Sequence, residues 1–121
     1  MDTASPALIV ACLCAQWCGV CREWRPSFEA LATHYPQARF VWIDVEEAAE
    51  TLDDGEVDNF PVLAVQRGAW LLHCDVLPQQ PGTWARLIDT LAALDAADAA
   101  QTATRRRQLG GLDIDLRRFL R

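Results

Sequence analysis

Two nearly continuous apolar runs, with an amphipathic stretch between them, set the pattern of the first half of the chain. Residues 7–14 (ALIVACLC) and 38–45 (ARFVWIDV) hold few polar positions, which is typical of strands buried on both faces of a sheet. From Gly19 to about Tyr35 the apolar residues recur every three or four positions, which predicts a helix. Pro26 falls inside this helix, where its missing N–H should bend the axis.

The second half of the chain predicts a short helix, a hairpin and a last helix. Residues 46–54 (EEAAETLDD) suit a short acidic helix. The apolar runs 60–66 and 69–76 predict a β-hairpin with Gly68 in its turn. Thr83 is the expected N-cap of a helix that carries an apolar stripe. We therefore expect an α/β domain with a central four-stranded mixed sheet flanked by helices.

The composition changes after this last helix, and we divide the chain there into a domain, residues 1–96, and a C-terminal extension, residues 97–121. The extension is rich in Ala and Arg. The extension could be helical. The apolar residues of its final segment fit both an amphipathic helix and an added edge strand, so the two conformations stay open there: Leu112, Ile114, Leu116, Phe119 and Leu120. Six arginines against two aspartates give residues 105–121 a charge of +4, which leaves −10 on the rest of the chain.

Charge and hydropathy exclude several classes of partner. The net charge of −6 argues against a general nucleic-acid binder, which needs a basic face to neutralise phosphates. No apolar run approaches the about 18 residues of a membrane-spanning helix, so we expect no membrane partner. The segment before the apolar residues 7–15 contains Asp2 and neither Lys nor Arg, whereas a secretory signal has a positively charged segment there. We therefore expect a cytoplasmic protein, in which closely spaced cysteines serve catalysis or metal binding more often than a disulfide framework.

The candidate chemistry lies in the stretch CLCAQWCGVC, which holds Cys12, Cys14, Cys18 and Cys21. Cys18 follows a predicted buried strand and opens a predicted helix. The first N–H groups of a helix have no partner within it and carry partial positive charge, so they stabilise a thiolate there. Cys21 lies in the same helical turn and can reach Cys18. The pair therefore predicts thiol–disulfide exchange, in which Cys18 attacks and Cys21 resolves.

Other roles for the cysteines stay open. The four sulfurs could ligate zinc or copper, although two nearly contiguous pairs, one on a buried strand, make a tetrahedral site awkward. Cys12 suits core packing, whereas Cys14 could form an alternative disulfide or act as a regulatory thiol. Cys74 lies next to His73 on a predicted strand, where adjacent side chains point to opposite faces, so we expect Cys74 to pack in the core.

These motifs resemble the thioredoxin family. WCGVC, from Trp17 to Cys21, is similar to the W-C-G-P-C of that family, with valine in place of proline. Pro26 falls where the family has a helix-kinking proline, and FP, residues 60–61, falls close to its cis-proline. ID at 43–44 and RG at 67–68 also occur in the family's order, and the resemblance covers roughly residues 6–96. Several correlated features are far more specific than a single C-x-x-C.

The resemblance implies a protein-disulfide reductase whose substrates are protein disulfides. It implies that Cys18 is the nucleophile, that Cys21 is the resolving thiol and that an unidentified reductase or thiol donor regenerates them. It implies no cofactor and no bound metal. The substrate would contact the backbone of Phe60 beside a cis-Pro61, and the implied substrate-binding residues are Trp17, Gly19, Val20, Phe60 and Pro61.

The chain also departs from the family pattern. Cys12 stands where thioredoxins have a buried aspartate, Phe40 where they have its lysine partner, and Cys14 where they have a second tryptophan. Replacing both members of a buried charge pair leaves no unpaired charge, but it removes the proton acceptor that would help to deprotonate Cys21. These departures modestly favour an alternative function, a non-catalytic protein-interaction module on the thioredoxin fold.

The resemblance further implies that the family's first strand and helix are missing. Residues 38–45 would then lie at the edge of the sheet, and a long apolar edge strand invites pairing. We expect either the C-terminal extension or a second subunit, in a homodimer, to cover it.

Overall fold

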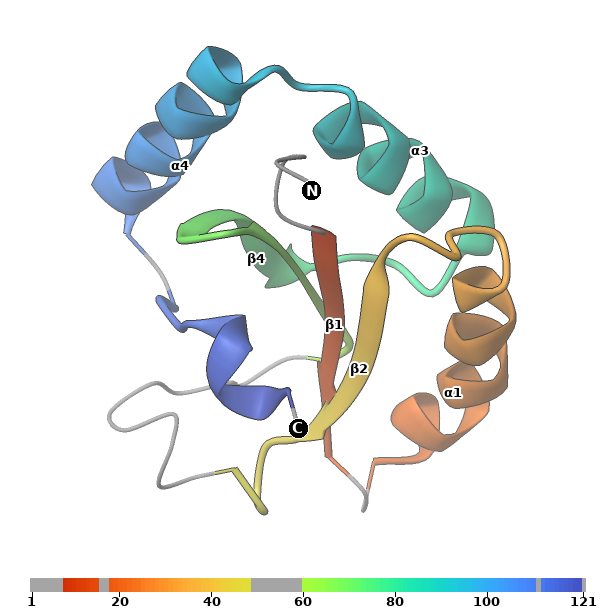
Figure 1. The fold of residues 1–121 in the computed structure, drawn as a ribbon. Helices are drawn as coiled ribbons and strands as arrows, with labels where there is room; N and C mark the ends of the chain where they lie inside the picture. The colour runs from red at the N-terminus through yellow and green to blue at the C-terminus, as the bar shows by residue number, and fades with distance from the viewer. Residues whose placement is uncertain (1–7, 16–17, 49–59, 111, 121) are drawn as a thin grey trace.

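The computed structural model describes residues 8–15, 18–48, 60–110 and 112–120. In chain order the elements are β1 (Leu8–Cys14), α1 (Gly19–Ala32), β2 (Arg39–Asp44), β3 (Val62–Arg67), β4 (Trp70–Val76), α3 (Pro81–Ala92), α4 (Ala96–Leu109) and the 3₁₀ helix η1 (Leu116–Phe119). The strands form one sheet in the order β2-β1-β3-β4 (Figure 1). β1 and β2 are parallel and the other pairs are antiparallel. The expected four-stranded mixed sheet flanked by helices is confirmed.

β1 is central because its apolar sequence suits burial on both faces. From Ile9 to Cys14 every residue is buried. Its register places Cys14 beside Asp44 of β2 and Leu13 beside Val62 of β3. The end of β1, the end of β2 and the start of β3 therefore meet at one end of the sheet.

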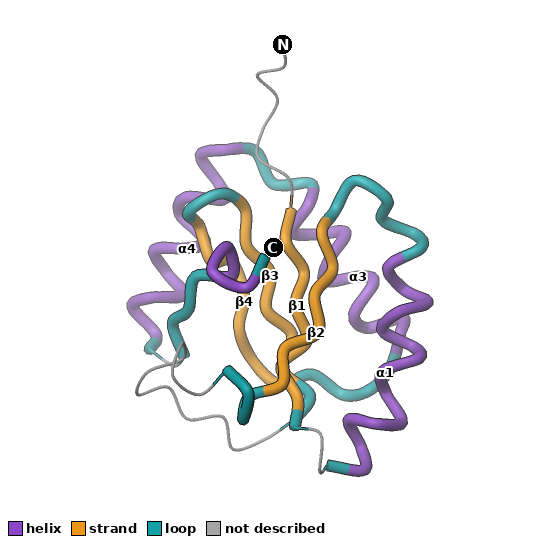
Figure 2. Tube along the Cα trace, turned by 60° about the horizontal axis from the view of Figure 1, so that its bottom comes forward, coloured by secondary structure: helices purple, strands orange, loops and turns teal. Residues whose placement is uncertain are grey.

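Helices α1 and α3 cover one face of the sheet (Figure 2). Their large aromatic side chains pack in the core on that face. α1 turns Cys21, Trp24 and Phe28 inward at the three- and four-residue intervals that the sequence predicts. Trp84 of α3 is fully buried against them, with its ring centroid 4.8 Å from that of Trp24 and 6.1 Å from that of Phe28. The Trp84 indole N–H donates to the Pro78 carbonyl at 2.7 Å, so its one polar atom is satisfied.

The C-terminal segment, residues 112–120, packs on the opposite face of the sheet. Leu116 of η1 is fully buried in a cluster with Ile9, Ala11 and Leu13 of β1. α4 lies along β4 and leads the chain to this face (Figure 1). The C-terminal segment thus forms neither of the two conformations that its sequence pattern left open, a regular amphipathic helix or an added edge strand.

A buried amide holds the C-terminal segment in place. Gln66 of β3 is 1% exposed and accepts a hydrogen bond from the backbone N–H of Leu116 at 2.7 Å. Its own Nε2 donates to Asp115 Oδ1 at 2.8 Å and to the Gly68 carbonyl at 2.8 Å. Arg117 donates to the same carboxylate at 2.7 and 2.9 Å. Gln66 therefore fixes η1 by satisfying groups that would be costly to bury unpaired.

This contact should make the stability of the chain sensitive to acid. The hydrogen bond from Arg117, with that from the Gln66 amide, holds the pKa of Asp115 well below its usual range. A lowered pKa stabilises the folded state above the ordinary carboxyl pKa of about 4, and this contribution is lost as the pH falls. We expect the free energy of unfolding of the wild type to exceed that of Asp115→Asn near neutral pH. The difference should be at most about 1 kcal/mol, because the carboxylate is partly exposed.

The measurement is chemical unfolding of both proteins from neutral pH to about pH 3. The difference between their free energies of unfolding should shrink as the pH falls. Asparagine keeps the acceptor for Gln66, so the comparison isolates the charge. A difference that stays constant or widens in acid would contradict this assignment.

Two expectations about helices are wrong. Thr83 is not the N-cap of α3: Gln80 holds that position and Pro81 is the first helical residue. Proline suits this place because its fixed φ and missing N–H cost nothing there. Residues 45–48 form turns and not the start of an acidic helix, and the rest of the 46–54 prediction lies outside the described residues.

The hairpin and the edge strand agree with expectation. Gly68 adopts a φ of 58° between β3 and β4, a conformation that favours glycine. β2 lies at the edge of the sheet, and the homodimer through it stays a prediction. Along the described parts of the chain, no helix combines the length and the apolar character that a bilayer crossing demands.

Candidate active site

Cys18 is the residue immediately before α1, where the connection from β1 ends. Its backbone is extended, with φ −85° and ψ 122°, and it forms the N-cap of α1. Its N–H donates to the Ala15 carbonyl at 3.0 Å, and its carbonyl accepts the first helical hydrogen bond, from the Arg22 N–H at 3.2 Å. The thiol is half-buried and free. It makes no capping hydrogen bond and stands beside the first helical N–H groups with no acidic residue in the first turn.

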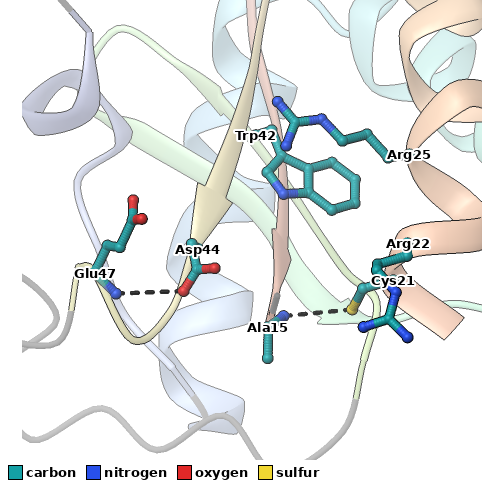
Figure 3. Close-up of a pocket in the computed structure, with 7 residues that line it drawn as sticks. All are labelled: Ala15, Cys21, Arg22, Arg25, Trp42, Asp44 and Glu47. Atoms are coloured by element: carbon teal, nitrogen blue, oxygen red, sulfur yellow. Dashed lines mark hydrogen bonds between the residues drawn. The ribbon is translucent and has the colours of Figure 1, made fainter. Parts of the chain in front are cut away.

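Cys21 points inward from the first turn of α1. It is 1% exposed, and its Sγ accepts a hydrogen bond from the Ala15 N–H at 3.4 Å (Figure 3). The sulfur is joined in a disulfide to Cys14, the last residue of β1, with 5.7 Å between the two Cα atoms. Cys14 is fully buried. The disulfide therefore ties the end of the central strand to the start of the helix, beneath the surface.

The bonded pair differs from the pair that the sequence predicts. In this structure Cys21 is bound to Cys14, and Cys18 remains a free thiol. The sequence contained a signal for this outcome, because Cys12 and Cys14 share a face of β1 and Cys21 belongs to the inward stripe of α1. That signal could not choose between Cys14 and Cys18 as the partner of Cys21, since the choice depends on how the strand end and the helix approach each other.

The residues around Pro61 lie at the same end of the sheet as the cysteines. The peptide bond between Phe60 and Pro61 is cis. Because β3 begins with Val62 opposite Leu13, Pro61 precedes β3 at the end where β1 leads to Ala15. The Pro61 carbonyl accepts from the Leu77 N–H at 3.3 Å, and Phe60 is half-buried.

The other sequence-predicted contact residues lie on α1 or outside the described part of the chain. Gly19 and Val20 are exposed in the first turn, with Val20 38% exposed. A Cβ added to Gly19 would meet only the Arg22 side chain, at 3.9 Å, so this glycine is not required by crowding. Trp17 lies outside the described residues.

The family's buried charge pair is replaced by an apolar region. Cys12 is fully buried, and burial raises the pKa of its thiol, so it is protonated at neutral pH. Phe40 is half-buried, with its ring 5.3 Å from Phe28 and 5.9 Å from Tyr35. Neither position carries a carboxylate or an amine, so neither can serve as a proton acceptor for Cys21.

Cys74 lies apart from the other four cysteines. It belongs to β4 and packs against the second face of the sheet, as expected for core packing. Burial raises the pKa of its thiol to about 12. His73 bonds through Nδ1 to the Leu63 carbonyl at 3.0 Å, so it is held by the backbone.

A pocket of about 290 Å³, which sequence analysis did not predict, lies beside the disulfide. It is lined by Ala15, Cys21, Arg22, Arg25, Trp42, Asp44 and Glu47 (Figure 3). The Arg25 guanidinium lies 5.0 Å from the Trp42 ring centroid. The two arginines project from α1 on one side, and Asp44 and Glu47 lie on the other. The parallel register of β1 and β2 brings Asp44 beside Cys14. The sequence indicates only that both residues lie at the ends of predicted strands.

A metal site finds no support among the described residues, where no three His, Cys, Asp or Glu side chains are grouped as ligands. The disulfide also engages two of the four sulfurs that a zinc or copper site would use.

Comparison with known proteins identifies one family. The Thioredoxin family model matches residues 2–75. The chain is 37% identical over 60 residues to Thioredoxin-1 of Saccharomyces cerevisiae, covering 50% of this chain and 58% of that protein. It is 29% identical over 73 residues to the thioredoxin of Ophiophagus hannah, covering 60% and 70% of the two chains. The chain thus spans less than two thirds of the yeast relative's length.

Solved structures show the same fold. The germline-specific thioredoxin Deadhead of Drosophila melanogaster superposes with a TM-score of 0.62 at 26% identity, covering 70% of this chain and 81% of the other. Oxidised mitochondrial thioredoxin 3 of Saccharomyces cerevisiae gives a TM-score of 0.62 at 27% identity, covering 71% and 80%.

Proposed function

The chain belongs to the thioredoxin family, and from that premise we propose that it exchanges disulfides with protein substrates, with Cys18 as nucleophile and Cys21 as resolving thiol. One observation carries the proposal: Cys18 is a free, partly accessible thiol at the N-terminus of α1, one helical turn before Cys21. Cys12 and Cys74, the other free thiols, are held protonated by burial at neutral pH.

The exchange requires two displacements. The Cys18 thiolate attacks one sulfur of the substrate disulfide, forms a mixed disulfide and releases the first substrate thiolate. The Cys21 thiolate then attacks Cys18 Sγ, which forms a Cys18–Cys21 disulfide and releases the second substrate thiolate. The substrate is reduced by two electrons, and the cysteine pair is oxidised by two. A dithiol donor returns the pair to the reduced state.

The substrate would bind where the exposed first turn of α1 meets the start of β3. Val20 offers an apolar surface beside Cys18, and Phe60 stands before the cis-proline at the same end of the sheet. We assign Trp17, Gly19, Val20, Phe60 and Pro61 to substrate contact. Affinity would come from backbone pairing with an extended substrate segment, since these side chains carry no charge.

We propose the cytoplasm as the compartment and reduction as the direction. Three of the five cysteines are free thiols, which suits an environment that keeps thiols reduced. The donor that regenerates the pair would be a reductase or a small dithiol.

The experiment that tests the function is insulin reduction with dithiothreitol as the regenerating dithiol. Catalytic acceleration above the rate of dithiothreitol alone supports the proposal. Its absence, with the purified chain folded by circular dichroism, would favour the alternative of a non-catalytic interaction module. The observation behind that alternative is that Cys21, the resolving thiol, is bound to Cys14 and is not available in this state.

A further inference from the structure

We propose that Cys14 is a third redox thiol of this site, which takes the disulfide over from Cys18 and stores it inside the core as the Cys14–Cys21 bond. The proposal rests on the exchange activity proposed above. It gives the Cys14–Cys21 disulfide a place in the reaction: it is the state of the chain after one substrate disulfide has been reduced.

Cys21 stands between two partners. Cys14 is the last residue of β1 and forms the disulfide with Cys21. Cys18 is the N-cap of α1, three positions before Cys21, a spacing that brings side chains to the same face of a helix. Cys12, two residues before Cys14 on the same strand face, is buried in the same cluster but is free. The arrangement therefore allows Cys21 to exchange partners between Cys18 and Cys14, and it leaves Cys12 out.

The transfer balances without another reactant. After the substrate has been reduced, Cys18 and Cys21 share a disulfide and Cys14 is a thiol. The Cys14 sulfur attacks Cys21 Sγ as its thiol gives up its proton, the Cys14–Cys21 bond forms, and the Cys18–Cys21 bond breaks with its electron pair on Cys18. The departing Cys18 sulfur takes up the proton that the Cys14 thiol releases, so protons balance as well. The number of disulfides and the oxidation level of the chain stay the same.

The difference between the two disulfides is their access to solvent. In the Cys14–Cys21 bond the sulfurs belong to residues that are 0% and 1% exposed, so an external thiol has little access to either sulfur, even though Cys21 lines one wall of the neighbouring pocket. Cys18 is half-buried and lies one helical turn before Cys21. Cys18 is therefore the thiol that can reopen the stored bond, by attacking Cys21 Sγ and displacing Cys14. An external dithiol then reduces the accessible Cys18–Cys21 form.

The first test locates the disulfide after one turnover. The fully reduced full-length chain is mixed with one equivalent of insulin and quenched in acid. It is then unfolded and labelled at free thiols with N-ethylmaleimide, reduced, and labelled again with iodoacetamide. Tandem mass spectrometry assigns the label on each cysteine. We expect the second label on Cys14 and Cys21 and the first label on Cys18.

Each other outcome overturns the proposal. The second label on Cys18 and Cys21, with Cys14 carrying the first, would leave the proposed function standing and remove Cys14 from the reaction. The first label on all cysteines, with insulin still oxidised, would overturn both the relay and the proposed function. Cys12→Ala is the matched control, because it removes a buried thiol from the same strand face and should leave the Cys14–Cys21 label pattern unchanged.

The second test has a readout that does not depend on turnover. The Cys14–Cys21 disulfide is formed in the wild type and in Cys18→Ser, and its reduction by dithiothreitol is followed by the same labelling. Removing the Cys18 thiol should slow this reduction at least about tenfold, because external thiols have little access to the buried bond. Equal rates, in a variant whose circular dichroism matches the wild type, would show that external thiols reach the bond directly and would contradict the relay.

Discussion

Replacing Cys18 by serine should reduce insulin turnover to the rate of the regenerating dithiol alone. A serine hydroxyl cannot form the mixed disulfide with which the reaction begins, so the loss should be complete. The fold should persist, because Cys18 is half-buried, makes no capping hydrogen bond and takes no part in the disulfide. The measurement is the rate of insulin precipitation, with circular dichroism and thermal unfolding to establish that the variant is folded.

Cys74→Ser is the matched control for this prediction. Cys74 is also a free thiol, but burial raises its pKa to about 12. It packs on the face of the sheet that the C-terminal segment covers. We expect turnover close to that of the wild type. If Cys18→Ser retained half of the activity while Cys74→Ser lost it, the wrong cysteine would have been assigned as the nucleophile.

Trp84→Ala should destabilise the chain by about 3–5 kcal/mol, the range for removing a large buried aromatic side chain. Trp84 is fully buried and connects α3 to Trp24 and Phe28 of α1. Its loss would leave a cavity between both helices and the sheet, and it would also remove the hydrogen bond to the Pro78 carbonyl. The measurement is the free energy of unfolding in urea, with both proteins in the same thiol oxidation state.

Two variants separate the contributions to this effect. Trp84→Phe keeps an aromatic ring but loses the indole N–H, so it should cost clearly less than alanine. Leu109→Ala, at a residue that is 83% exposed, should stay within about 0.5 kcal/mol of the wild type. A Trp84→Ala variant as stable as Leu109→Ala would mean that α3 does not depend on this contact.

The four strands and α1 could be predicted from the sequence because periodicity follows directly from which face is buried. The strands end within one or two residues of the predicted runs, and the helix after Cys18 carries the inward stripe that its spacing indicates. The start of α3 was mispredicted because Thr83 is a good N-cap by type, whereas the Pro81 ring sets the helical φ two residues earlier.

Two features depended on contacts far apart in the sequence. The C-terminal segment could not be predicted, since its apolar pattern fits helix and strand equally and the decision lies with Gln66, on β3, which binds Asp115 and Leu116. The sequence left the partner of Cys21 open: it predicted Cys18 and kept an alternative disulfide of Cys14 as a possibility, which the structure shows. Cys14 and Cys18 both lie near it along the chain, and only the packing of α1 on β1 brings the Cys14 sulfur into bonding position.

The most direct test of the account traps the first covalent step. A Cys14→Ala/Cys21→Ala variant keeps the nucleophile and removes both thiols that could resolve a mixed disulfide. After exposure to an oxidised disulfide peptide and acid quench, intact and tandem mass spectrometry should find one peptide half bound per chain, on Cys18. An adduct on Cys12 or Cys74, or an unmodified folded chain, would contradict the assignment of Cys18 as the thiol that attacks the substrate.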